Sequence, residues 1–122
     1  MKKKFLDLSF ETRKKEGDRI LLKYPERIPV IVFKNEHCED LPQISKTKFL
    51  VPLDLSIFKF NYTIRNYLEL PNYQAFVLFN VDPYTNTKRL MNGSSLISEI
   101  YSFYKAPDGF LYMEYQSENT FG

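Results

Sequence analysis

The chain has 122 residues, of which 43% are apolar and 26% are charged, and its net charge is only +2. This length suits one domain with one ordinary core, and the composition is that of a soluble globular protein. Nucleic-acid binding needs a concentrated basic face and a membrane span needs roughly 20 apolar residues, and the sequence has neither. The single cysteine, Cys38, allows no intrachain disulfide, so we expect a cytoplasmic protein.

The first predicted element is a helix over residues 10–24, which Ser9 would cap and Pro25 would end. Its middle is highly charged, and Gly17 interrupts the pattern. The apolar positions that would face the domain are Phe10, Ile20, Leu21 and Tyr24. We expect a surface helix in one or two pieces.

Two strands are predicted next. The β-branched run at 27–34 reads as the first strand, and 46–52, which closes with Pro52, reads as the second. The polar connection between them, at 35–45, has a length that suggests an antiparallel pair. Since proline is tolerated mainly at sheet edges, the second strand is a credible edge strand.

The clearest element is a helix between residues 56 and 70, which Ser56 would cap and Pro71 would follow. Its apolar residues recur at helical spacing and should form one buried face. These residues are Ile57, Phe60, Ile64 and Leu68.

The continuous apolar run at 75–81 predicts a strand buried on both faces. Residues 82–95 read as a polar loop. A short helix follows, whose shared face would consist of Leu96, Ile100 and Phe103.

A turn signal at 106–109 and an alternating run at 110–116 predict the last strand, before a polar tail. The order of elements predicts an α+β protein with a ubiquitin-like β-grasp and an additional N-terminal helical segment. We divide this single domain into an N-terminal helical segment at 1–24, a β-grasp core at 25–116 and a flexible conjugation tail at 117–122.

Residues that could carry catalysis or hold a metal are few. His37, Cys38, Glu39 and Asp40 are consecutive, and neighbouring side chains diverge, so a solvated loop is the favoured interpretation over a metal site. No second histidine accompanies Cys38, and no glycine-rich phosphate loop is present. We therefore predict neither an enzyme nor a cofactor.

Four segments resemble the GABARAP-type autophagy ubiquitin-like modifiers, the autophagy-related protein 8 family. They are FETRKKEGDRI at 10–20, RIPVIV at 27–32, KTKFLVPLDL at 46–55 and DGFLYMEYQSENTFG at 108–122. With the helix between residues 56 and 70, the likeness covers nearly the whole chain in the right order.

The resemblance implies a conjugation mechanism. An activating enzyme adenylates an exposed C-terminal glycine, here Gly122, and a conjugating enzyme transfers it to phosphatidylethanolamine. Partners of the family also include a processing protease and cargo receptors. The protein would be a monomer before conjugation and would reach the autophagosomal membrane through the covalent lipid.

The resemblance also implies two pockets that bind peptides with an aromatic residue and, three positions later, an aliphatic one. Positions that match the aromatic pocket are Glu16, Ile20, Pro29, Ile31, Lys48, Leu50 and Phe110. Positions that match the aliphatic pocket are Phe49, Val51, Pro52, Leu55, Phe60 and Thr63. Lys48 could pair with acidic residues before the aromatic. By periodicity alone, Ile31, Leu50, Phe60 and Phe110 would instead be core.

The sequence departs from the family at a few positions. Thr63 replaces an aliphatic residue, which would make the second pocket more polar, and Asn66 and Tyr67 replace a basic pair. The loop at 82–95 is longer than usual. Two alternatives stay open: a non-conjugated β-grasp protein-interaction module, and, with the least support, a small enzyme.

Overall fold

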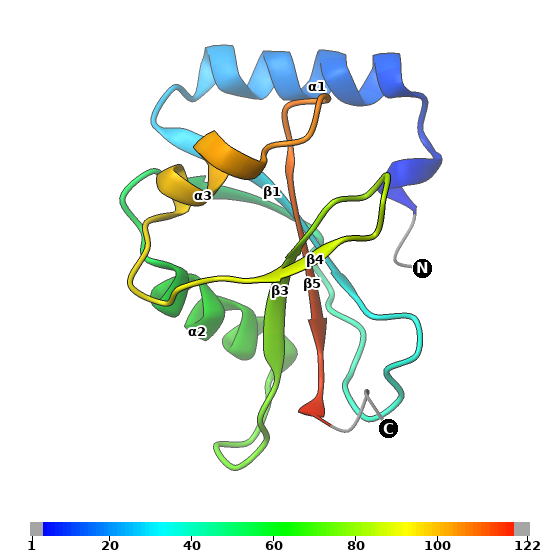
Figure 1. Cartoon of the computed structure of the whole chain (residues 1–122), viewed down its shortest axis with the longest axis vertical. Helices are drawn as coiled ribbons and strands as arrows, with labels where there is room; N and C mark the ends of the chain where they lie inside the picture. Colours follow the sequence, from blue (N-terminus) through cyan, green and yellow to red (C-terminus); the bar gives the residue numbers. More distant parts are fainter. Residues whose placement is uncertain (1–3, 119–122) are drawn as a thin grey trace.

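The structure is a computed structural model, and it describes residues 4–118. Its centre is a five-stranded mixed sheet in the order β2-β1-β5-β3-β4 (Figure 1). The strands are β1 (Arg27–Lys34), β2 (Lys48–Pro52), β3 (Val77–Val81), β4 (Lys88–Leu90) and β5 (Leu111–Gln116). The two central strands, β1 and β5, run parallel, and the other neighbours are antiparallel.

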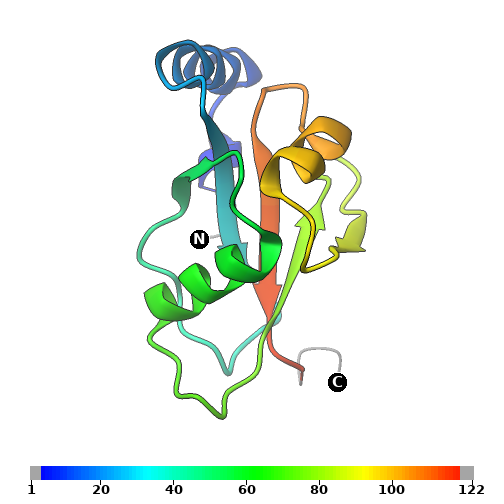
Figure 2. The ribbon, with the colours of Figure 1, turned by 90° about the vertical axis from the view of Figure 1, so that its left-hand side faces the viewer.

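Three α-helices accompany the sheet, namely α1 (Phe10–Lys23), α2 (Ile57–Leu68) and α3 (Ile97–Tyr104), and a short 3₁₀ turn, η1 (Phe5–Asp7), precedes them. Helix α1 lies across one end of the strands, while α2 and α3 lie together beside the sheet (Figures 1 and 2). This arrangement is the predicted α+β β-grasp with an N-terminal helical segment.

The sheet separates two hydrophobic clusters, because successive side chains of a strand point to opposite faces. On β1, Val30 and Val32 pack in the cluster that contains α2 and α3, whereas Ile31 and Phe33 pack in the cluster that contains Ile20 of α1. Burial on both faces explains why β1 reads as a nearly continuous apolar run. All six residues of β5 are also buried, including Glu114 and Gln116, so its alternating sequence does not mark an exposed face.

Helix α2 confirms its predicted face. Its buried residues are Ile57, Phe60, Ile64 and Leu68, and the Ser56 side chain accepts a hydrogen bond from the Lys59 amide at its N-terminus. The predicted face of α3 is partly wrong. Ile97 and Ile100 are buried, whereas Leu96 and Phe103 are exposed, because the helix begins one residue later than the shared spacing assumed.

The region 82–95 is not only a loop. Residues 88–90 form β4, which pairs with β3 at the edge of the sheet. The Asp82 amide donates to the carbonyl of Thr87, and Asn86 takes a left-handed conformation with φ 61°, so residues 82–87 make a tight connection between the two strands. The three residues of β4 are too few to show an alternation of polar and apolar side chains that would predict a strand.

Gly17 does not interrupt α1, which is one continuous helix. The prediction of its apolar face was also partly wrong, since the buried residues are Arg13, Gly17 and Ile20, and Phe10 is exposed. A Cβ atom at Gly17 would lie 2.4 Å from the carbonyl oxygen of Asp108. Glycine at this position therefore lets α1 approach the turn before β5 closely.

We expect Gly17→Ala to lower the free energy of unfolding by about 1–3 kcal/mol, because the added methyl group overpacks this contact. In an exposed helix the same change would be stabilising by roughly 0.5–1 kcal/mol, so the sign is informative. Urea denaturation measures the difference, and Lys15→Ala, at an exposed position of α1, should change stability by less than about 0.5 kcal/mol. A stabilised Gly17→Ala protein would contradict the close approach.

The polar connection after β1 is attached to β5 by side-chain hydrogen bonds. The Tyr115 hydroxyl accepts from the Ile44 amide and donates to the Pro42 carbonyl. Burial raises the pKa of Tyr115 to about 12. Ser117, just after β5, is buried and donates to Asp40, so the chain stays packed one residue beyond the strand.

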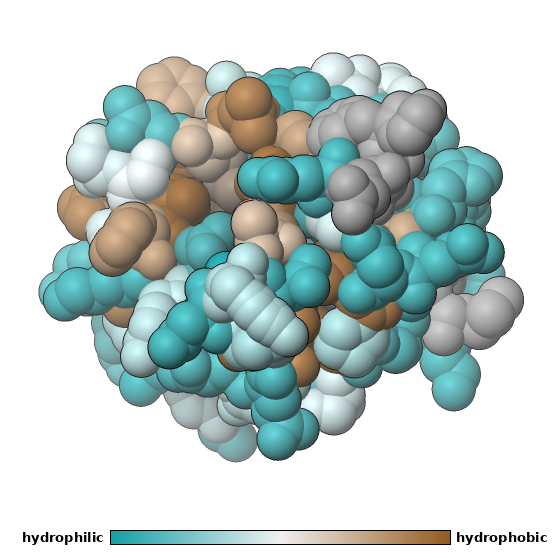
Figure 3. Space-filling view, turned by 90° about the horizontal axis from the view of Figure 1, so that it is seen from below, coloured by the Kyte–Doolittle hydropathy of each residue, from teal (hydrophilic) through white to brown (hydrophobic). Residues whose placement is uncertain are grey.

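The end of the molecule at which β5 ends carries apolar patches separated by hydrophilic side chains (Figure 3). None of the helices within residues 4–118 is long and apolar enough to cross a membrane.

Candidate functional site

The outer edge of β2 carries hydrogen-bonding groups that no described strand uses. The Val32 amide donates to the Thr47 carbonyl, so the alternation of an antiparallel ladder makes Val30–Phe49 and Ile28–Val51 the hydrogen-bonded pairs. The backbone groups of Lys48 and Leu50 must then point away from β1, toward the edge. Pro29 lies opposite Leu50, at a position where its missing N–H costs no hydrogen bond to β2.

One of these edge groups already has a side-chain partner. Arg27, at the start of β1, donates from Nη1 to the Leu50 carbonyl at 3.1 Å. This hydrogen bond is exposed, so it can exchange with water or with an added strand at little cost. The β2 edge confirms the prediction that residues 46–52 contain an edge strand.

A hollow of about 310 Å³ opens on the α2 side of this edge. All of the residues predicted for the aliphatic pocket line it, and Phe49, Val51 and Phe60 are its buried floor. The complete lining is Lys46, Phe49, Leu50, Val51, Pro52, Leu55, Phe60, Thr63 and Tyr67.

Thr63 and Tyr67, two of the residues at which the sequence departs from the family, both line this hollow. The Thr63 hydroxyl donates to the Lys59 carbonyl of its own helix at 3.1 Å, so it brings no unpaired donor. Tyr67 packs edge-on against Phe49, with ring centroids 5.1 Å apart. Lys46 Nζ lies 5.0 Å from the centroid of the Phe49 ring. The sequence did not predict Tyr67 and Lys46 as lining residues, although helical spacing from Phe60 and Thr63 places Tyr67 on this side.

The residues predicted for the aromatic pocket meet on the opposite, α1 side of the edge. Pro29 and Ile31 of β1 lie beside Leu50 and Lys48 of β2, respectively. The fully buried members are Ile20, Pro29, Ile31 and Phe110, and the partly exposed members are Glu16, Lys48 and Leu50. The buried members form the floor, and for Ile31 and Phe110 this agrees with the periodicity. The partly exposed members form the rim, and these include Leu50, which periodicity had assigned to the core.

The rim is charged. Lys48 Nζ lies 4.0 Å from a carboxylate oxygen of Glu16, which is also bound by Arg19. These three residues form an exposed network at the mouth of the aromatic pocket. The rim thus has two cationic side chains, Lys48 and Arg19, and one anionic side chain, Glu16, so it would attract the carboxylate of a ligand.

The floor of this pocket is not empty. Phe5 of η1 packs edge-on against Phe110, with ring centroids 4.8 Å apart, and lies 6.4 Å from the centroid of Tyr112. Lys48 Nζ lies 5.6 Å from the centroid of the Phe5 ring. Phe5 was not predicted at this position, because a turn of three residues has no periodicity to indicate which way a side chain points.

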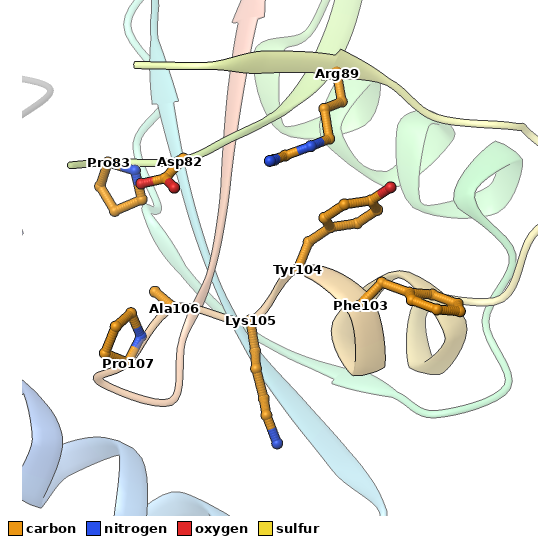
Figure 4. A pocket seen from close by; sticks show the side chains of 8 residues that line it. All are labelled: Asp82, Pro83, Arg89, Phe103, Tyr104, Lys105, Ala106 and Pro107. Atoms are coloured by element: carbon orange, nitrogen blue, oxygen red, sulfur yellow. The ribbon is translucent and has the colours of Figure 1, made fainter. Parts of the chain in front are cut away.

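A second, smaller hollow of about 140 Å³ lies between α3 and the β3–β4 connection (Figure 4). Arg89 there lies 4.4 Å over the Tyr104 ring and donates to the Asn80 side chain at 3.0 Å. The Arg89 guanidinium therefore already interacts with side chains of the fold. Within residues 4–118, no group of three histidine, cysteine or acidic side chains could hold a metal ion. His37 is exposed, whereas Cys38 is buried.

The geometry of the β2 edge defines what it can accept. An extended segment that pairs with Lys48 and Leu50 points residues three positions apart to opposite faces of the sheet. One such side chain would reach the α1-side pocket, and the other would reach the α2-side hollow. The predicted attachment point, Gly122, lies outside the described residues.

Comparisons with known proteins agree with this architecture. A family model described as "Autophagy protein Atg8 ubiquitin like" matches residues 12–122. Autophagy-related protein 8 of Pichia angusta is 47% identical over 113 residues, which cover 93% of this chain and 85% of that protein. Autophagy-related protein 8e of Arabidopsis thaliana is 46% identical over 119 residues, covering 96% and 90%.

Among solved structures, the crystal structure of Trypanosoma brucei ATG8 matches with a TM-score of 0.81 and 32% identity, covering 96% of this chain and 95% of that one. The likeness therefore extends over the sheet, all three helices and both sides of the β2 edge. The chain belongs to the Atg8 family of ubiquitin-like autophagy proteins.

Proposed function

We propose that this protein is conjugated through Gly122 to phosphatidylethanolamine and that it recruits partners by binding peptides of the aromatic-x-x-aliphatic kind. Activating and conjugating enzymes and a processing protease would act on its C-terminus. Cargo receptors would dock at the β2 edge of the lipid-anchored form on the autophagosomal membrane.

The observation that carries the docking proposal is the position of the β2 edge between two pockets on opposite faces. Peptides that bind by strand addition take affinity from main-chain hydrogen bonds and specificity from pockets for alternate faces. Lys48 and Leu50 would supply the hydrogen bonds. The aromatic side chain would enter between Ile31 and Phe110, and the aliphatic one would rest on Phe49 and Phe60.

A titration followed by amide chemical shifts tests this function. The probe is a synthetic peptide with two glutamates before a tryptophan and a leucine three positions after it. We expect shifts at Lys48–Val51 and a micromolar Kd, equivalent to about 8 kcal/mol. The matched control peptide has alanine in place of the tryptophan and the leucine. Shifts confined to α3 and β4 would contradict docking at β2.

A second arm of the same titration tests the role assigned to the rim. An exposed ion pair contributes about 0.2–1 kcal/mol, so Lys48→Ala should weaken the glutamate peptide by up to about fivefold. A peptide with glutamines before the tryptophan should bind both proteins alike. Added salt should weaken binding of the glutamate peptide to the wild-type protein in the same way, because Lys48 is partly exposed and its attraction to the glutamates is screened by ions. An equal loss for both peptides would mean that Lys48 acts by packing.

A further inference from the structure

We propose that Phe5 is an intramolecular occupant of the aromatic pocket, which a docking peptide has to displace. The inference rests on the proposed peptide-binding function. Phe5 packs on Phe110, the floor of the pocket, and lies beneath the Lys48 ammonium at its rim. An incoming aromatic side chain needs the same floor and the same rim, so the two rings exclude each other.

The turn that carries Phe5 is attached to the domain by a buried side chain. Arg13 Nη1 donates to the carbonyls of Leu8, at 2.6 Å, and Leu6, at 3.3 Å. The same guanidinium donates from Nε to Asp108 at 3.0 Å, with both side chains buried. Arg13 therefore fixes the chain just beyond Phe5, and the ring is held at the pocket by its own backbone.

The segment imitates only half of a ligand. Phe5 and Leu8 have the spacing of an aromatic and an aliphatic residue, but residues 5–7 form a 3₁₀ turn and not a strand. Leu8 is 45% exposed, and the α2-side hollow is lined entirely by residues 46–67. The occupant thus blocks the aromatic pocket while it leaves the aliphatic one open.

This arrangement makes the apparent affinity depend on how often the turn is released. If Phe5 fills the pocket about nine-tenths of the time, the apparent Kd is about ten times the intrinsic one. A weakly packing aromatic residue in a peptide would compete poorly against Phe5, whereas tryptophan, with a larger ring, would compete better. Phe5 would therefore select for peptides with the strongest aromatic anchor.

The test compares wild type with Phe5→Ala in the titration with the glutamate–tryptophan peptide. We expect Phe5→Ala to bind about tenfold more tightly. The control variant is Leu8→Ala, which changes an exposed side chain of the same segment and should bind like wild type. The control peptide, with alanine in place of tryptophan only, should bind wild type and Phe5→Ala with the same affinity, because it does not need the pocket.

The outcomes separate this inference from the function on which it rests. Equal affinity of wild type and Phe5→Ala for the tryptophan peptide would overturn the occupant while leaving peptide docking intact. A gain for the control peptide as well would also overturn it, since the effect would then not arise in the aromatic pocket. Absence of binding to both proteins would overturn peptide docking itself, and the occupant with it.

Discussion

Replacing Asp108 with alanine should lower the free energy of unfolding by about 3–5 kcal/mol, the usual cost of removing one partner from a buried ion pair. The Asp108 carboxylate accepts hydrogen bonds from Arg13 Nε, the Phe110 amide and the Tyr112 hydroxyl, and its side chain is fully buried. Its loss would leave three buried donors without this acceptor, one of them charged.

The electrostatics of the cluster explain the size of the effect. Burial disfavours the charged form of Arg13, but its interactions with Asp108, Tyr84 and Tyr112 together outweigh that effect, so the pKa of Arg13 lies above its usual value. An arginine guanidinium stays protonated in proteins, so Arg13 would remain a buried cation when Asp108 is gone. Burial and then the hydrogen bond to Asp108 raise the pKa of Tyr112 far above its usual range, so this hydroxyl keeps the proton that it donates.

Urea denaturation measures the change, and the chain contains a matched control. Lys14 and Asp18 form an exposed ion pair on the same helix, so Asp18→Ala should cost no more than about 0.5 kcal/mol. Asp108→Asn keeps the shape and one acceptor, and we expect an intermediate loss. A loss below about 1 kcal/mol for Asp108→Ala would show that water or another group replaces the carboxylate.

Elements with strong local patterns could be predicted from the sequence. Helix α2 combines a serine cap with four apolar residues on one face, and its burial follows that face. The β1–β2 pair was predictable because β-branched runs flank a connection of suitable length, and Pro52 indicated an edge. In these segments local propensity and tertiary burial favour the same structure.

The remaining features depend on contacts between distant segments. Gly17 resembles a helix breaker in sequence, but it is required by the approach of the turn at Asp108. In sequence Arg13 resembles a solvated helix residue, yet it is buried and donates a hydrogen bond to Asp108, which lies 95 positions further along the chain. Neither a periodicity nor a propensity carries such information, so sequence reasoning missed both.

The candidate site was predictable mainly through resemblance. Ile31, Phe60 and Phe110 are buried, as periodicity alone would predict, and nothing in their spacing distinguishes a pocket floor from ordinary core. The α2-side residues named from the family pattern all line one hollow in the structure. It did not indicate Phe5, whose position depends on the hydrogen bonds from Arg13 to the turn that follows it.

Replacing Gly122 with alanine should abolish lipid attachment while leaving stability and peptide affinity unchanged. A terminal glycine has no side chain, so it can pass through a narrow enzyme channel and present an unhindered carboxylate. The assay combines activating and conjugating enzymes, ATP and vesicles containing phosphatidylethanolamine, and mass spectrometry detects the adduct. Thr120→Ala, which alters the tail but keeps the terminal glycine, should be converted like wild type.

The physical reason to expect a complete effect is the strength of the anchor. Each buried methylene contributes about 0.8 kcal/mol, so the two acyl chains of one lipid hold a protein far more firmly than a few surface lysines. None of the helices in the described part of the chain could span the membrane in their place. Gly122→Ala should therefore stay in solution when the vesicles are sedimented. A wild-type chain that also stays unmodified, while another family member is converted alongside it, would favour the non-conjugated interaction module, with docking at β2 as its whole activity.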